Sequence, residues 1–205
     1  KIRPGAYEYE VAAAGEYVCR LNGANSFAYS CIVGSGERAK AVVPTATNKV
    51  MNAGELVMIG IAPRINGYAG TFGDTLPVSG TFTQRQKDLL NHMRETLRLT
   101  KAMLKPGMTG REIDVPGRRY YEKHDLAKYI VCPFAHSIGL MEAEAPFFGP
   151  NGDFALVPGM AVMVDISFFN HPELHGGRIE TGYVITETGC EPFSKKMDAY
   201  FMKDL

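Results

Sequence analysis

The sequence predicts an α+β fold, in which helices gather on one face of a mostly antiparallel sheet and the same arrangement occurs twice. Three observations predict it. Two segments recur in the same order about 100 positions later, each copy shows helical spacing followed by short strands, and the chain of 205 residues suits one core better than two. We therefore expect residues 1–205 to form a single domain.

The repeat consists of two pairs of matching segments. IRPGAYEYEV at 2–11 matches LKPGMTGREI at 104–113 in an aliphatic residue, a base, Pro-Gly, a glutamate and a β-branched residue. GELVMIGI at 54–61 matches GMAVMVDI at 159–166. Because both matches occur in the same order with nearly the same separation, we interpret them as a duplication with an internal pseudo-two-fold axis.

The first copy opens with a predicted helix. Apolar residues from Val11 to Leu21 fall at helical spacing after Pro4-Gly5, and Asn22-Gly23 is a typical C-terminal stop. The strongest helical pattern, at 83–104, joins the two copies and starts with a Thr83/Gln86 capping box. No counterpart of this joining helix precedes the first copy, so we expect that helix, and any N-terminal domain before it, to be missing from the sequence as given.

The helix of the second copy is less regular. Thr109 and Glu112 form a capping-box pattern, but Pro116-Gly117 in the next turn should break or restart the helix. Five short segments bounded by Gly or Pro are predicted strands: Phe27 to Val33, Leu56 to Ile61, Tyr129 to His136, Ala161 to Phe169 and Ile179 to Ile185.

Composition excludes several classes of protein. The 22 basic residues balance the 22 acidic ones, which disfavours a nucleic-acid partner or an anionic membrane surface. No apolar run approaches the roughly 20 residues of a membrane span. The four cysteines show no CxxC spacing, which indicates buried thiols in a reducing, cytoplasmic setting: Cys19, Cys31, Cys132 and Cys190.

Three polar residues interrupt apolar strands and are the candidate catalytic residues: His136 in FAHSIG, Asp165 in VMVDIS and Glu180 in RIETGYVI. Burying an acid among apolar neighbours costs several kcal/mol unless a cation or a shared proton compensates it. The structural alternative is that the histidine is an ordinary core residue and that an acid pairs with a nearby base such as Arg178.

Four segments in order carry a family resemblance. They are GELVMIGIAPRINGYAGTFGDTLPVSG, AHSIGLMEAEAPFFG, LVPGMAVMVDI and GGRIETGYVITETG. Together they resemble the pita-bread fold of methionine aminopeptidase, aminopeptidase P, prolidase and creatinase, from about Ile2 to Glu191. The resemblance implies a curved, mostly antiparallel sheet with helices on its outer face.

The resemblance also implies five metal ligands, of which this chain keeps three. His136 matches the family histidine, Asp165 an acid that is usually Glu, and Glu180 the last Glu. The two family aspartates of the first half fall on Gly60 and Thr71.

Other family positions are altered as well. The second family histidine falls on Ala143, and an upstream histidine falls near Val42 or Val43. Gly73-Asp74-Thr75 stands where the family often has Thr-Arg-Thr, so the sign of the charge is reversed there.

These departures favour a metal-independent hydrolase, with no cofactor, acting on a C–N bond. A two-metal site should not form without the aspartates. Asp165 and Glu180 facing each other across a dry cleft should raise the pKa of one carboxyl, which would supply a general acid, with His136 as base or orienting group. These three side chains could instead hold one divalent ion. Creatinase is the family precedent for the metal-free route.

Other residues are candidates for binding substrate. Arg64, Tyr68 and Asp74 belong to the first-half hairpin, which should face the same cleft, and Arg64 could hold a carboxylate. His171 and His175 in HPELHGG could supply an imidazole, although Pro172 and Gly-Gly favour a loop.

The sequence leaves alternatives open. The substrate is expected to be a small amide, an amidine or a short peptide. One alternative is a non-catalytic binding module, as the family includes histone-chaperone and growth-regulating members. Another is an Xaa-Pro peptidase-like metallohydrolase with an altered metal site. Because members of the family are commonly dimers, the resemblance also implies a homodimer.

Overall fold

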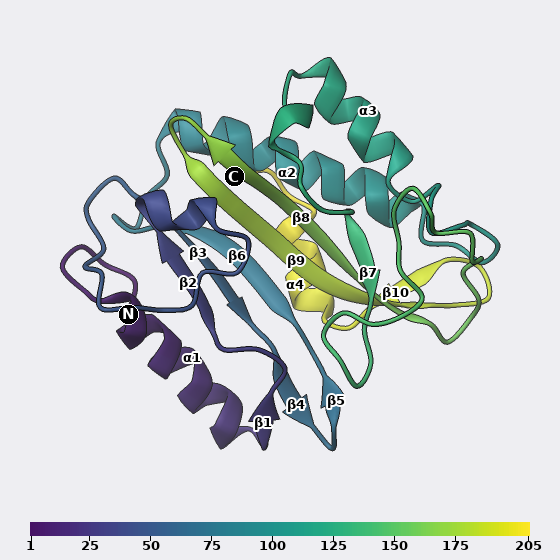
Figure 1. Ribbon diagram of the computed structural model, residues 1–205, viewed down its shortest axis with the longest axis horizontal. Helices are drawn as coiled ribbons and strands as arrows, with labels where there is room; N and C mark the ends of the chain where they lie inside the picture. Colours follow the sequence, from purple (N-terminus) through teal and green to yellow (C-terminus); the bar gives the residue numbers. More distant parts are fainter.

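A curved antiparallel sheet of seven strands runs through the molecule, in the order β2-β3-β6-β9-β8-β7 with β10 paired to β9 (Figure 1). The computed structural model describes residues 1–205. The strands of the first half are β2 (Ile32–Ser35), β3 (Leu56–Ile61) and β6 (Phe72–Pro77); those of the second are β7 (Ala135–Ser137), β8 (Ala161–His171), β9 (His175–Ile185) and β10 (Cys190–Pro192).

The helices are α1 (Glu8–Leu21), α2 (Gln84–Ala102), α3 (Val115–Lys123) and α4 (Lys195–Phe201), with short 3-10 helices η1 (Gly36–Lys40) and η2 (Ala127–Tyr129). A second, small sheet contains β1 (Ser26–Phe27), β4 (Pro63–Ile65) and β5 (Tyr68–Ala69). No helix combines the length and the apolar character that crossing a membrane requires.

The predicted duplication is confirmed by the strand order. Read from either edge, the main sheet begins with a short strand and continues into a hairpin, β3–β6 in one half and β8–β9 in the other. The two hairpins meet where Gly73 of β6 lies opposite Glu180 of β9. A helix precedes each half, α1 in the first and α3 in the second. The fold is therefore the predicted α+β pita-bread arrangement.

The two least regular predictions need correction. The segment Phe27–Val33 is not one strand, because β1 ends at Phe27 and β2 begins only at Ile32. In the segment Tyr129–His136, only the last residues enter β7. Pro133 lies just before that strand and has no N–H to give to a sheet, so the chain enters the sheet after it.

The helix predictions stand with adjusted ends. Thr109 and Glu112 make the capping contacts, but only turns follow until α3 begins at Val115, with Pro116 in its first turn. The ring of a proline is compatible with a first turn, where its missing N–H costs no helical hydrogen bond. The helix α2 carries the Thr83/Gln86 capping box as predicted.

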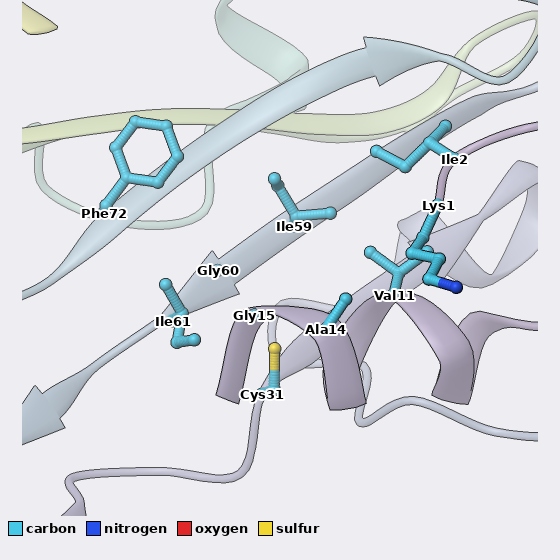
Figure 2. Close-up of a pocket in the computed structure, with 10 residues that line it drawn as sticks. All are labelled: Lys1, Ile2, Val11, Ala14, Gly15, Cys31, Ile59, Gly60, Ile61 and Phe72. Carbon is cyan, nitrogen blue, oxygen red and sulfur yellow. The ribbon is translucent and has the colours of Figure 1, made fainter. Parts of the chain in front are cut away.

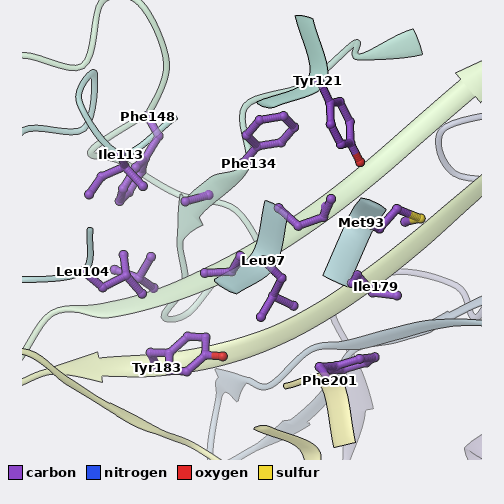
Figure 3. Packing of buried hydrophobic residues seen from close by; sticks show 14 of the residues in the cluster. Met93, Leu97, Leu104, Ile113, Tyr121, Phe134, Phe148, Ile179, Tyr183 and Phe201 are labelled. Carbon is purple, nitrogen blue, oxygen red and sulfur yellow. The ribbon is translucent and has the colours of Figure 1, made fainter. Parts of the chain in front are cut away.

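The main core lies on the outer face of the second half. The apolar face of α2 packs against β8 and β9, and α3 and α4 each add buried side chains to this core (Figure 3). Its buried members include Met93, Leu97, Leu104, Ile113, Tyr121, Phe134, Phe148, Ile179, Tyr183 and Phe201. Because outer-face side chains fill this core, the residues that alternate with them along β8 and β9 point to the inner face.

The matching place in the first half is an apolar groove of about 290 Å³ (Figure 2). Val11 and Ala14 of α1 form one wall, and Ile59 and Ile61 of β3 form the other. In the second half, α2 fills the equivalent space between α3 and the sheet.

Candidate active site

The strand register places the three predicted catalytic residues on the inner face of the sheet. Asp165 of β8 lies directly opposite Glu180 of β9, and β7 carries His136 beside β8. The His136 Nε2 atom is 3.3 Å from Glu180 Oε1. The structure therefore brings His136 and Glu180 into contact, with Asp165 beside Glu180 on the neighbouring strand.

Asp165 is engaged with a base instead of with the histidine. Its Oδ1 accepts hydrogen bonds from Arg178 Nε at 3.2 Å and from Ser167 Oγ. Both Asp165 and Arg178 are buried, so this is an ion pair shielded from solvent. The structural alternative weighed for this acid, pairing with Arg178, is thus present in the fold.

A third carboxylate joins the histidine, and sequence reasoning missed it. Glu142 Oε1 lies 3.4 Å from His136 Nε2, so the same ring nitrogen faces both Glu142 and Glu180. Glu142 lies in the HSIGLMEAE segment, but no strand or helix periodicity marks it. Only the loop that returns over β7 brings it back, and a local sequence pattern does not encode such a return.

Burial and charge shift the pKa values of this group upward. Burial lowers the pKa of His136, but the hydrogen bond to Glu180 and the charges of Glu180, Asp165 and Glu142 outweigh it and raise the pKa above the usual range. Burial raises the pKa of Glu180, and the charge of Asp165 adds to that rise. The imidazole and the carboxyl therefore share a proton that is held more firmly than in solution.

The two first-half positions at which the resemblance implies metal ligands, Gly60 and Thr71, carry no carboxylate. A Cβ added at Gly60 would lie 3.2 Å from the hydroxyl oxygen of Tyr29, so that phenol fills the space beside the glycine. The hydroxyls of Tyr29 and Thr71 are buried and have no hydrogen-bond partner. With no carboxylate at either position, the residues present do not fit a two-ion site.

Arg178 fills the space over the other first-half strand. A Cβ at Gly73 would lie 2.9 Å from Arg178 Cδ, so the glycine lets the arginine chain cross close to β6. Thr75 Oγ1 donates to the Arg178 carbonyl at 2.8 Å and accepts from its N–H at 2.8 Å, which holds the backbone in place. The only buried cation on this face is thus anchored from both halves.

The three predicted substrate-binding residues lie in different surroundings. Arg64 donates through Nε to the Leu140 carbonyl at 3.1 Å, so it braces the loop that carries Glu142. Tyr68 is 65% exposed on β5 and is available to a ligand.

The prediction that Asp74 faces the cleft is wrong. It points to the helix side of the sheet, where its Oδ2 accepts a hydrogen bond from the Tyr200 hydroxyl. Alternation along β6 explains this, because Gly73 and Thr75 occupy the inner face.

The histidines of the β8–β9 turn do not supply an imidazole to the site. His171 Nδ1 accepts the backbone N–H groups of Glu173 and Leu174, which shapes the turn. His175 lies opposite it at the end of the hairpin, away from Glu180. The loop reading of HPELHGG holds for its centre alone, since Pro172 to Leu174 form a turn while His171 ends β8 and His175 begins β9.

Comparison with known proteins gives a consistent result. Residues 1–187 match metallopeptidase family M24. The Xaa-Pro dipeptidase of Pyrococcus furiosus is 30% identical over 195 residues, which cover 95% of this chain and 56% of that protein. The Xaa-Pro aminopeptidase of Escherichia coli is 30% identical over 217 residues, covering 93% of this chain and 49% of that protein.

Solved structures agree. The prolidase from Pyrococcus horikoshii OT3 superposes with a TM-score of 0.88 at 26% identity, covering 100% of this chain and 56% of that one. The Xaa-Pro dipeptidase from Bacillus anthracis gives 0.88 at 32% identity, with 95% and 54% covered. The chain thus spans about half the length of the relatives it matches.

Proposed function

Because the chain belongs to metallopeptidase family M24, we propose that it is a hydrolase that cleaves a C–N bond in a short peptide or a small peptide-like molecule. The observation that carries the proposal is the contact of one imidazole nitrogen with two carboxylates, Glu180 and Glu142, on the inner face of the sheet. A sheet face without chemistry has no evident need for acids buried on it.

Different residues of this group carry out the two proton transfers of hydrolysis. Glu142 is the most exposed carboxylate of the group and accepts a proton from the attacking water, whose oxygen bonds to the carbonyl carbon. As the C–N bond breaks, the proton shared by His136 and Glu180 passes to the leaving nitrogen. Asp165 and Arg178 keep Glu180 in place from the neighbouring positions.

The metal-independent route expected from the sequence would use these groups alone and describes the chain with no ion bound. A two-ion mechanism is left out, because Gly60 and Thr71 offer no carboxylate. A single divalent ion fits the donors His136, Glu142 and Glu180. When bound, it would polarise the substrate carbonyl and lower the pKa of a bound water.

Xaa-Pro peptides are the first substrates to consider. The relatives named above are Xaa-Pro dipeptidases and an Xaa-Pro aminopeptidase. The altered first half is the reason to include small amides and amidines. Tyr68 is proposed to contact the substrate. The homodimer and the cytoplasmic location stay predictions.

The test is a panel of Xaa-Pro di- and tripeptides, matched Xaa-Ala peptides and small amides, assayed by release of the free amine. We expect turnover of at least one class, and a loss of at least about 100-fold in kcat/KM for Glu180→Gln and for His136→Ala. Thermal melting checks that both variants fold.

The matched control is Glu173→Gln, an exposed acid at the turn of the same hairpin, which should leave kcat/KM unchanged. Peptide binding without turnover, in the presence and absence of added metal, would replace the hydrolase by the binding-module alternative.

A further inference from the structure

His136, Glu142 and Glu180 form a convergent set of metal-type donors. One ligand atom from each lies within 4.8 Å of the others. The carboxylate oxygens of Glu142 and Glu180 are 3.4 and 3.3 Å from His136 Nε2. Zinc bonds to His and carboxylate are about 2.0 to 2.2 Å long, which places tetrahedral ligands about 3.4 Å apart. The two distances therefore match the edges of a tetrahedral site.

An incompletely satisfied carboxylate provides an independent sign of a ligand. The Glu180 side chain is only 1% exposed, and its Oε2 has no hydrogen-bond partner. A buried carboxylate oxygen without a donor costs about 1 to 3 kcal/mol or more, so a cation at this place would offset that cost.

The nearby base does not supply the missing cation to this oxygen. Arg178 donates through Nε to Asp165 and Ser167, and it makes no hydrogen bond to Glu180. The ligand atoms that converge come from His136, Glu142 and Glu180, and Asp165 is not among them. The second-half acid that a family ligand set would use is therefore neutralised, while Glu142 is free to replace it.

The loop that carries Glu142 is fixed from the first half. The Ala69 N–H donates to the Gly139 carbonyl at 2.8 Å, and Arg64 donates to the Leu140 carbonyl. The Met141 N–H donates to the Glu144 carboxylate at 2.9 Å, which closes the loop on itself. Glu142 is thus held over His136 before any ion arrives, which lowers the cost of binding.

We propose that His136, Glu142 and Glu180 bind one divalent transition-metal ion, with Glu142 supplying a ligand from the loop and Asp165 staying outside the set. One imidazole and two carboxylates suit Zn²⁺ or Mn²⁺. The proposal deepens the proposed function, because it concerns the same site. It makes this a one-ion site assembled from the second half, in place of a two-ion site shared by both.

The experiment is calorimetric titration of Zn²⁺ and of Mn²⁺ into the chelator-treated full chain. We expect one ion per chain, weakened at least about 10-fold by Glu142→Gln. The matched control is Glu144→Gln, two positions further along the same loop, whose amide oxygen still accepts the Met141 N–H; it should bind as the wild type does. Asp165→Asn should weaken binding less than Glu142→Gln does, because Asp165 is bonded to Arg178 and Ser167 and not to a ligand of the ion.

Co²⁺ absorption gives a second readout that does not depend on turnover. Wild-type protein and the Glu144→Gln variant should show the same four-coordinate visible bands, and Glu142→Gln should alter them. Absence of stoichiometric binding would overturn the proposal, as would loss of binding in Asp165→Asn with retention in Glu142→Gln. Turnover together with no ion binding in the titration would reject this site and keep the hydrolase; ion binding with no turnover of any substrate would keep the site and reject the hydrolase.

Discussion

The two halves of the molecule share the same backbone arrangement but carry different residues on the inner face of the sheet. On the inner face, Gly60 lies opposite Gly73 in the first half, and Asp165 lies opposite Glu180 in the second. The strand register is the same in the two halves, whereas these acids lie in the second half only. The comparison teaches that the fold and the site are separable, because the first half still forms its hairpin with no functional side chain at these positions.

On the outer face, it is the first half that carries the buried acid. Asp74 follows Gly73 on β6 and is a buried acid, whereas Thr181 follows Glu180 on β9 and is neutral. The packing on that face differs too, because α2 covers the second half and the first half keeps an apolar groove beside α1. Substitutions at these positions can therefore make one half resemble the other.

The largest expected effect comes from returning an acid to the first half. In Gly60→Asp, the new carboxylate would meet Ile32 and the Tyr29 hydroxyl in a buried place with no cation. We expect a loss of roughly 3 kcal/mol in the free energy of unfolding, measured with urea in the presence of chelator.

Gly60→Ala is the control for that substitution, since it adds the Cβ, 3.1 Å from Ile32, but no charge. It should cost about 1 kcal/mol. Adding Mn²⁺ to Gly60→Asp combined with Thr71→Asp should recover part of the stability, because the ligand pattern of both halves would be restored. Equal stability of Gly60→Asp and the wild type in chelator would mean that the first-half position is open to water, and the contrast between the halves would fail.

Much of this architecture could be predicted from the sequence, for identifiable reasons. The runs that form β3 and β8 are apolar and repeat each other, and the capping box at Thr83 marks the start of α2, so local patterns were enough there. The positions of His136 and Glu180 followed from motif order. Glu142 did not, because its place depends on a loop held by Arg64 from the other half. Asp74 was misplaced because the strand β6 was not predicted, and without it the alternation could not be counted.

A smaller effect is expected from filling the space that Arg178 uses. In Gly73→Ala, the added Cβ would lie 2.9 Å from Arg178 Cδ and 3.0 Å from Glu180 Cβ. The arginine must shift, which strains its ion pair with Asp165, and we expect a loss of about 1 to 3 kcal/mol in urea unfolding.

The matched glycine is Gly70, just before the same strand, where an added Cβ meets nothing within 4 Å. Gly70→Ala should stay within about 0.5 kcal/mol of the wild type. A similar loss in both alanine variants would show that the cost comes from backbone freedom in the first half and not from contact with Arg178.

The last effect depends on pH and concerns the outer-face acid. Burial raises the pKa of Asp74 to about 6, against the opposing hydrogen bonds from Thr75 and Tyr200 and the charge of Arg94. An unfolded aspartate titrates near about 3.9, so between these values the native state binds more protons than the unfolded state. The stability contributed by protonated Asp74 is therefore present below about pH 4 and is lost as the pH rises through about 6.

Asp74→Asn removes that titration and makes the first half resemble the neutral Thr181 of the second. We expect the variant to be more stable than the wild type by about 2 kcal/mol at pH 8 and nearly equal to it at pH 4, from thermal melts across that range. Asp88→Asn on the exposed side of α2 is the control for the removal of one negative charge. A difference of constant size at all pH values would mean that the amide gains stability by packing alone, and that the outer faces of the two halves do not differ in buried charge.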